Sequence, residues 1–265
     1  MLNRLMKYDL RRTLKFLVVF ILLSLFFGGL TRFIGTLGDS LALEVIKGIC
    51  NGTAISMMCS LCINCFMRSW VMFRASLYGD ESYLSHTLPV KREAHYVSKA
   101  LTALICLFVS MIVVIGVLFI MFWSDSTKQL LAGFLDSFAL FFDVPAWSIV
   151  VAIFAILFFE FFNMLQCGFT GIILGHRFNR SKVLFSVLFG FAAYMVTQVI
   201  VIIVMLLIGF LNSDMMKVFH TDDLAQLKPE VLVAFTLIGT ALYVIFSAVG
   251  FVINARLLKK GVNVD

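Results

Sequence analysis

The sequence predicts an all-α polytopic membrane protein with six transmembrane helices and with both termini in the cytoplasm. Of the 265 residues, 62% are hydrophobic and only 14% are charged, and the mean hydropathy is +1.03. A soluble core of this size cannot enclose so much apolar surface, whereas a bilayer can. The apolar residues form six long segments, and Lys and Arg are concentrated in alternate connections between them. Composition therefore excludes an ordinary soluble domain.

Six segments are long and apolar enough to span a membrane, which requires roughly 20 residues for a hydrocarbon layer of about 30 Å. They are residues 15–36, 46–67, 98–123, 146–173, 183–211 and 231–255. The first lacks a small-residue cleavage site after it and is interpreted as a retained signal-anchor. Leucines at helical spacing among the basic residues before it predict an N-terminal interfacial helix. With short loops, the spans account for a single transmembrane domain, residues 1–265.

The orientation follows from the basic residues, because cytoplasmic loops retain Lys and Arg. Of the 21 Lys and Arg residues, 16 lie in the N-terminal segment, the 68–99 region, the 175–182 loop and the C-terminal tail. The other five lie at or beyond the opposite ends of the spans, where the connections are rich in acidic residues. Both termini are therefore expected inside. The net charge of +6 is explained by this topology, and no nucleic-acid partner is expected.

Motifs for catalysis, metal binding or nucleotide binding are absent. The chain contains no H-E-x-x-H, no G-x-S-x-G and no G-x-x-x-x-G-K-[ST]. Cys59, Cys62 and Cys65 repeat every three residues, but a continuous helix would spread their thiols along its length, so they are interpreted as packing residues. We therefore expect no enzymatic activity, no metal and no cofactor on this chain. Any ATP and Mg would bind a partner ATPase.

Polar residues repeat at spacings of three and four along several spans, which places each set on one helix face. Close helix packing and a route for a substrate both account for such stripes. Glu160 is the only acidic residue deep inside a span, where a carboxylate costs about 3 kcal/mol. A substrate contact, a gating hydrogen bond and a structural bond stay open for it. The residues expected along a substrate route are Ser60, Asn64, Glu160, Tyr194 and Gln198.

The predicted cytoplasmic loop 68–97 contains a segment typical of a short exposed helix. Gly79 interrupts the preceding helix, and Pro89 limits the far end. Asp80 and Glu81 suit the positive end of a helix dipole. A helix of about two turns would place Tyr83, Leu84, Thr87 and Leu88 on one side. Such a helix either docks into a partner or lies on the membrane surface.

The stretch from Tyr78 to Pro89, YGDESYLSHTLP, followed by Lys99 at the start of a new span, resembles permease subunits of bacterial ABC-2-type transporters, especially those of Gram-positive bacteria. The resemblance implies an ATP-driven exporter in the bacterial plasma membrane. It also implies that two permeases pair, as a homodimer or a related heterodimer, each resting on a cytoplasmic ATPase. Many relatives carry re-entrant helices before the last span, whereas residues 212–230 are polar here.

The resemblance further implies that the loop after the second span couples the permease to the ATPase, and that the second and fifth spans border the route. The residues expected to couple are Asp80, Glu81, Tyr83, Leu84 and Leu88. Relatives handle drugs, antimicrobial peptides and lipid-like molecules. Two alternatives remain: a membrane partner or assembly protein without transport activity, and a secondary transporter. The latter would need paired intramembrane charges or a two-half repeat, and neither is visible in the sequence.

Overall fold

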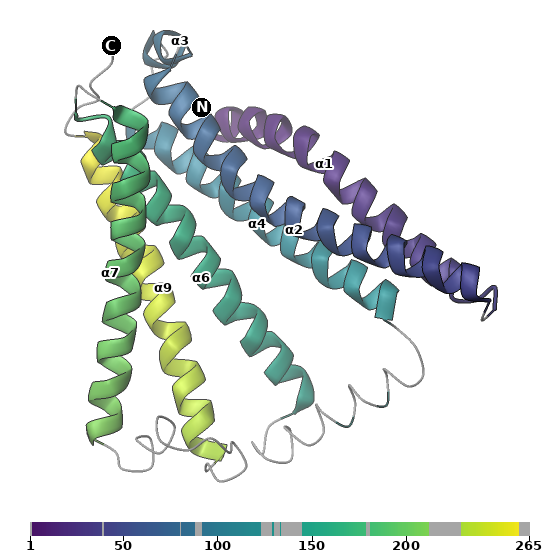
Figure 1. The fold of residues 1–265 in the computed structure, drawn as a ribbon. Helices are drawn as coiled ribbons and strands as arrows, with labels where there is room; N and C mark the ends of the chain where they lie inside the picture. Colours follow the sequence, from purple (N-terminus) through teal and green to yellow (C-terminus); the bar gives the residue numbers. More distant parts are fainter. Residues whose placement is uncertain are drawn as a thin grey trace. The chain divides into compact units, whose positions relative to one another are not determined.

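The computed structural model describes residues 2–38, 40–79, 81–87, 92–122, 129, 133, 145–178, 181–211 and 229–259. Their helices are α1 (Leu2–Ile34), α2 (Leu41–Tyr78), α3 (Ser82–Thr87), α4 (Arg92–Phe122), α6 (Ala146–Gly175), α7 (Lys182–Leu211) and α9 (Pro229–Lys259) (Figure 1). Six of these helices are long and apolar enough to cross a membrane, all except α3. The predicted all-α polytopic fold with six transmembrane helices is therefore confirmed.

The long helices extend beyond the apolar segments that identify them in the sequence. α2 continues to Tyr78 and α4 begins at Arg92, so only residues 79–91 of the predicted loop separate them. The added turns are helical because they bury their own apolar side chains, among them Phe73, Leu77 and Tyr96, each with no exposed surface. Similarly, α1 runs without a break from Leu2, so the expected interfacial helix and the first span form one helix.

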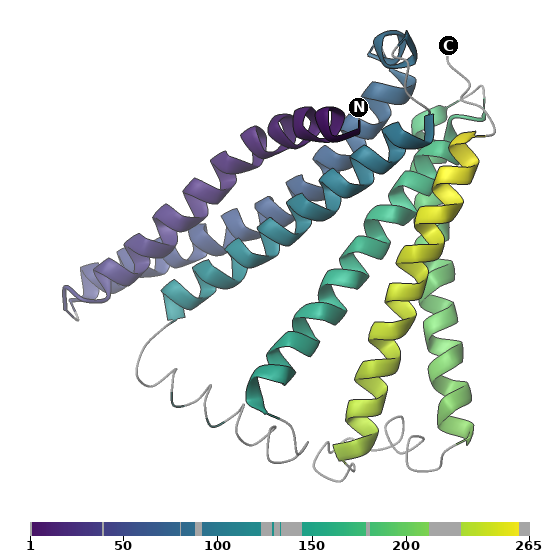
Figure 2. The ribbon, with the colours of Figure 1, turned by 180° about the vertical axis from the view of Figure 1, so that it is seen from behind.

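The chain divides into two compact units. Unit 1 comprises Met1–Gln129 and Leu258–Asp265, and unit 2 comprises Leu130–Leu257. In unit 1, α1 packs against both α2 and α4, which also pack against each other, as the two opposite views show (Figures 1 and 2). One part of this core consists of Ala54, Met58, Val117 and Met121. Gly28 allows the close approach there, since a Cβ atom on it would lie 2.8 Å from Val117 Cγ1.

In unit 2, α6 and α7 are in direct backbone contact through small residues. A Cβ atom added to Gly171 would collide with the backbone of Ser186 and Gly190, and one added to Gly175 would collide with Ser186. Ser181 adopts a left-handed backbone conformation (φ 52°) in the turn that precedes α7. Small residues at helix contacts are typical of membrane proteins, because backbones that approach closely gain van der Waals contact.

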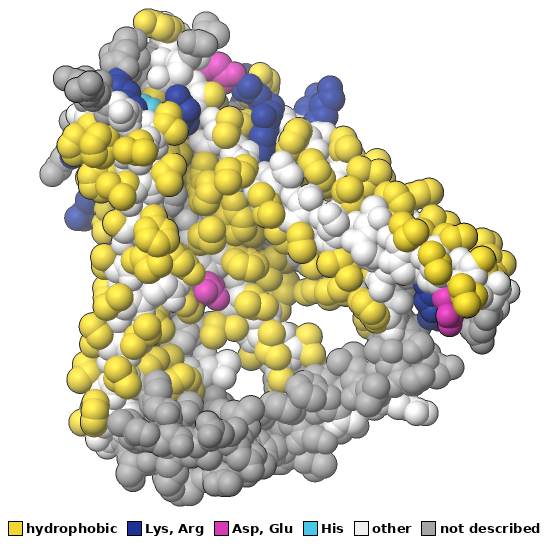
Figure 3. Space-filling view, viewed as in Figure 1, with side chains coloured by type: hydrophobic (Ala, Val, Ile, Leu, Met, Phe, Trp, Pro, Cys, Tyr) yellow, Lys and Arg dark blue, Asp and Glu magenta, His cyan; other side chains and the backbone are white. Residues whose placement is uncertain are grey.

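Large apolar side chains are exposed along the long helices of both units. Among the most exposed are Phe26, Phe210 and Leu237, with 62%, 72% and 62% of their surface accessible. Figure 3 shows one face on which hydrophobic side chains cover most of these helices, while Lys and Arg side chains gather near the start of α1. Exposed apolar surface of this extent suits a lipid environment.

Candidate functional site

A charged cluster ties the connection before α3 to helix α1. Arg12 on α1 donates two hydrogen bonds to the Glu81 carboxylate, from Nη1 to Oε2 at 2.8 Å and from Nη2 to Oε1 at 2.7 Å. The pKa of Glu81 lies below its ordinary value, mainly because Arg12 donates hydrogen bonds to the carboxylate. The positive charges of Arg12, Lys99 and Arg68 lower it further. Two parallel bonds fix the relative orientation of the two groups. Glu81, one of the predicted coupling residues, therefore anchors α3 to the N-terminal part of α1.

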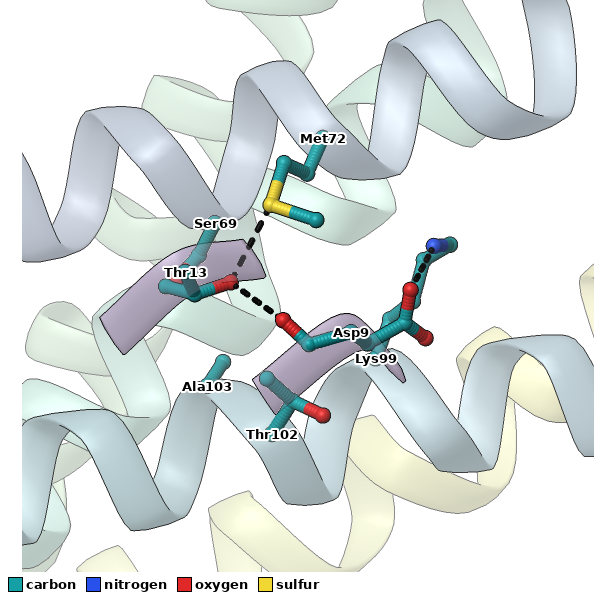
Figure 4. Close-up of a pocket in the computed structure, with 7 residues that line it drawn as sticks. All are labelled: Asp9, Thr13, Ser69, Met72, Lys99, Thr102 and Ala103. Atoms are coloured by element: carbon teal, nitrogen blue, oxygen red, sulfur yellow. Dashed lines mark hydrogen bonds and ion pairs between the residues drawn. The ribbon is translucent and has the colours of Figure 1, made fainter. Parts of the chain in front are cut away.

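A second ion pair, almost fully buried, joins the same part of α1 to α4. Asp9 accepts hydrogen bonds from Lys99 Nζ at 3.1 Å and from Ser98 Oγ at 2.8 Å. The side chains of Lys99 and Asp9 are only 8% and 6% exposed. Figure 4 shows the two side chains directed toward each other. The start of α1 is thus fixed to α4 by one charge pair and to the α3 connection by the other.

Beside the Asp9–Lys99 pair lies a small cavity of about 10 Å³, close to the least space that a water molecule requires. It is lined by Asp9, Thr13, Ser69, Met72, Lys99, Thr102 and Ala103 (Figure 4). The Thr13 hydroxyl donates to the Asp9 carbonyl oxygen at 2.9 Å and contacts Met72 Sδ at 3.1 Å. The buried Thr102 hydroxyl has no hydrogen-bond partner within the described part of the chain.

The structure describes only some of the predicted coupling residues. Glu81 is anchored as above, and Tyr83 on α3 is 67% exposed. Leu84 lies in α3, but its side chain is not described, and Asp80 and Leu88 lie outside the described residues. α3 has six residues, fewer than the two turns that the sequence suggested. Most of the surface of its tyrosine side chain is exposed.

In unit 2, polar side chains meet along the contacts of α6, α7 and α9. Asn163 donates to Thr197 Oγ1 at 3.1 Å, and Ser247 donates to the Phe159 carbonyl oxygen at 3.4 Å. Asn254 accepts a hydrogen bond from Thr170 at 2.7 Å. Its amide also donates to the Gln166 side chain at 3.1 Å. These bonds join α6 to both of its neighbours, so part of each polar stripe serves helix packing.

One group within unit 2 contains three of the five predicted route residues, and it is called the Glu160 group here. It consists of Glu160 on α6, Tyr194 and Gln198 on α7, and Tyr243 on α9. The Tyr243 hydroxyl donates to Gln198 Oε1 at 3.2 Å, and both Tyr194 and Tyr243 lie within electrostatic reach of the Glu160 carboxylate. Ser60 and Asn64 lie on α2 in unit 1, where the Asn64 amide donates to the Ser60 carbonyl oxygen at 2.8 Å. The route itself stays a prediction.

Sequence reasoning missed Asp9 and Asn254. Asp9 is the only acidic residue among the first 38, in a segment that is otherwise basic, and this isolation was a usable signal. Asn254 continues the stripe of α9, seven residues after Ser247 and therefore on the same helix face. Among the residues that the structure describes, no cluster of His, Cys, Asp and Glu could hold a metal ion.

Comparisons of the chain with protein-family models, with curated proteins and with solved structures give no match. The fold and the two polar groups define the class: an all-α multi-pass membrane protein with a charged cluster beside α3 and a polar group inside an apolar helix bundle.

Proposed function

We propose that the chain is the transmembrane subunit of an ATP-driven exporter in the bacterial plasma membrane. It would work with a separate cytoplasmic ATPase and with a second permease, identical or related. The observation that carries this proposal is α3, a short helix outside the six apolar helices that is anchored to α1 and exposes an aromatic side chain. An anchored, exposed helix of this kind suits docking into a groove of a soluble partner.

Two ion pairs, Arg12–Glu81 and Asp9–Lys99, connect α3 to the long helices of unit 1. A displacement of α3 would be passed through Glu81 and Arg12 to α1, and from there through Asp9 and Lys99 to α4. The second pair is buried, so water screens it little and it opposes separation of the two helices. In this mechanism the Arg12–Glu81 and Asp9–Lys99 pairs convert motion of the ATPase into movement of the helices in unit 1.

The docking part of the proposal is tested by replacing Tyr83 with alanine. A six-residue helix offers little contact area, so one exposed aromatic side chain should dominate the binding energy, as anchors in protein interfaces do. We expect Tyr83→Ala to weaken co-purification of the ATPase with the tagged full-length chain by about 30-fold, which corresponds to about 2 kcal/mol. The measurement is the ATPase recovered per permease from detergent-solubilised membranes.

Tyr8→Ala is the matched control, because Tyr8 lies on α1 of the same unit and is 65% exposed, nearly as much as Tyr83. It should leave the recovered ATPase unchanged. If no ATPase accompanies the parent chain, the exporter proposal fails, and a membrane partner or assembly protein becomes the better hypothesis. If both variants retain the ATPase, α3 is not the docking element.

A further inference from the structure

The exposed side of the first half of α1 carries positive charge that no acidic residue of the described chain neutralises. Its exposed basic residues recur at spacings of three and four, so they lie on one side of the helix: Arg4, Lys7, Arg11 and Lys15. We call these four residues the basic face; Figure 3 shows Lys and Arg side chains gathered near this part of α1. Within the described residues none of the four forms an ion pair, because the nearby Asp9 and Glu81 pair with Lys99 and Arg12 instead.

Beyond the basic face, the same side of α1 becomes apolar. Val18, Leu22 and Phe26 continue its spacing and are 41%, 60% and 62% exposed. Buried residues of α1, among them Leu17 and Ser24, lie on the opposite side. A surface that meets the exposed side must therefore be anionic next to the first half and apolar directly after it. The headgroup layer of a bilayer adjoins the hydrocarbon layer in this order, whereas an acidic protein or a nucleic acid offers only the anionic part.

The length of α1 places the basic face at the depth of the headgroups. The helix has 33 residues and is therefore about 50 Å long, whereas the hydrocarbon layer is about 30 Å thick. Even a tilt of about 40°, at the upper end for membrane helices, would leave part of it outside that layer. The basic first half is the part that extends into the headgroups. Tyr8, which is 65% exposed, belongs to a residue type that is enriched at this depth.

Arg68 on α2 supplies a guanidinium group beside the end of the basic face. Its Cζ atom lies 5.2 Å from the ring centre of Phe16, the residue that follows Lys15. In the described part of the chain Arg68 forms no ion pair, and its Nε atom has no hydrogen-bond partner. Stacking on the Phe16 ring orients the guanidinium, and guanidinium groups bind phosphates through two parallel hydrogen bonds. An arginine without an anion inside the chain therefore gains from a phosphate outside it.

We propose that the basic face and Arg68 together bind the headgroups of anionic phospholipids. The four exposed charges attract the lipid, and the guanidinium of Arg68 binds its phosphate. Asp9 and Arg12 join the same part of α1 to α4 and to the connection before α3, so a bound lipid fixes the segment to which both are attached. Such binding requires neither an ATPase nor transport and goes beyond the proposed function.

The test measures lipid binding to the purified full-length chain by native mass spectrometry from a neutral detergent. Phosphatidylglycerol and phosphatidylcholine with the same acyl chains are offered in equal amounts. A Lys or Arg beside an anionic surface contributes about fivefold to binding, so the parent should prefer phosphatidylglycerol by about tenfold or more. Lys7→Gln combined with Arg11→Gln should lower this preference by about fivefold or more. Arg68→Lys keeps the charge but loses the paired donors, and should weaken phosphatidylglycerol binding by about threefold.

Arg177→Gln combined with Arg256→Gln is the matched control, because it removes two exposed charges from unit 2 and changes the net charge equally. It should leave the preference unchanged. Thermal unfolding shows whether each variant is folded. If the Lys7 and Arg11 double variant is not, the preference of the parent must fall at raised ionic strength, since salt screens exposed charges.

Equal binding of the two lipids by the parent, or an equal loss in the double variant and its control, would overturn the inference. Tighter binding of polyglutamate than of phosphatidylglycerol would also overturn it and would assign the surface to an acidic protein. Undiminished phosphatidylglycerol binding by a folded Arg68→Lys variant would exclude Arg68 from the site. Because no ATPase is present, this experiment can fail while the Tyr83 experiment succeeds.

Discussion

At the scale of single residues, the Asp9–Lys99 pair shows how a membrane protein uses charge where its helices leave the apolar layer. Both side chains are buried, and Ser98 provides a further hydrogen bond to the carboxylate. Removing two charges from water is costly, and their attraction compensates only while both partners are present. The pair therefore specifies which face of α1 meets α4 more than it adds net stability.

A double-mutant cycle tests this interpretation. Asp9→Asn or Lys99→Met alone should lower the free energy of unfolding by about 3 kcal/mol, because each leaves a buried charge without its partner. The two substitutions together should cost clearly less than the sum of the single effects. Reversible denaturation of the purified protein, followed by circular dichroism, measures all three.

The Arg12–Glu81 pair serves as the control for that cycle. Its side chains are 35% and 41% exposed, so Arg12→Gln should cost less than about 1 kcal/mol. Strict additivity of Asp9→Asn and Lys99→Met would show that the two side chains do not interact in solution.

At the scale of helices, the contact of α6 with α7 depends on the absence of side chains. Gly171 and Gly175 are four residues apart, as are Ser186 and Gly190. Because these side chains are absent or small, the two backbones approach closely. At the end of α6, His176 Nδ1 lies 3.4 Å from the Ser186 hydroxyl oxygen. Lipid-exposed helices have no hydrophobic driving force for association, and close contact replaces it.

Adding one methyl group to this contact should separate the helices. We expect Gly171→Ala to lower the midpoint of thermal unfolding, at a cost of about 1–3 kcal/mol, because the new Cβ atom meets backbone that cannot rotate away. Gly116→Ala on α4 is the matched control, since no atom lies within 4 Å of its added Cβ. The control should be neutral or slightly stabilising, because alanine favours a helix more than glycine does. An unchanged midpoint for Gly171→Ala would contradict the close contact.

At the scale of the whole molecule, the six spanning helices of the described residues predict that both termini lie on one side of the membrane, and the basic residues predict that this side is the cytoplasm. Two exposed residues, one just after α1 and one just after α6, test the orientation, because the predicted topology places them on opposite sides of the membrane. On a background without the six native cysteines, Thr36→Cys should react with a membrane-impermeant thiol reagent in intact cells. Arg177→Cys should react only after permeabilisation. The reverse pattern would invert the topology and place α3 outside the cell, which no cytoplasmic ATPase could reach.

The fold class and the number of long helices were predictable from the sequence, because a span is recognised by local hydropathy alone. The helix ends were not, since α2 and α4 continue past their apolar segments wherever residues such as Phe73 and Tyr96 find a packing partner. The stripes predicted that polar residues share one face of each span, through packing or along a substrate route, and the structure joins two of them, Gln198 on α7 and Tyr243 on α9, by a hydrogen bond.

What the sequence by itself determined is therefore the membrane-spanning character of the chain and the faces on which its polar residues lie. Only the tertiary structure decided which polar residues meet: Asp9 with Lys99, 90 positions away, and Gln198 with Tyr243, 45 positions away. The physical reason is that hydropathy and periodicity are properties of one helix, whereas a contact depends on how two helices are rotated and how closely small residues let them approach.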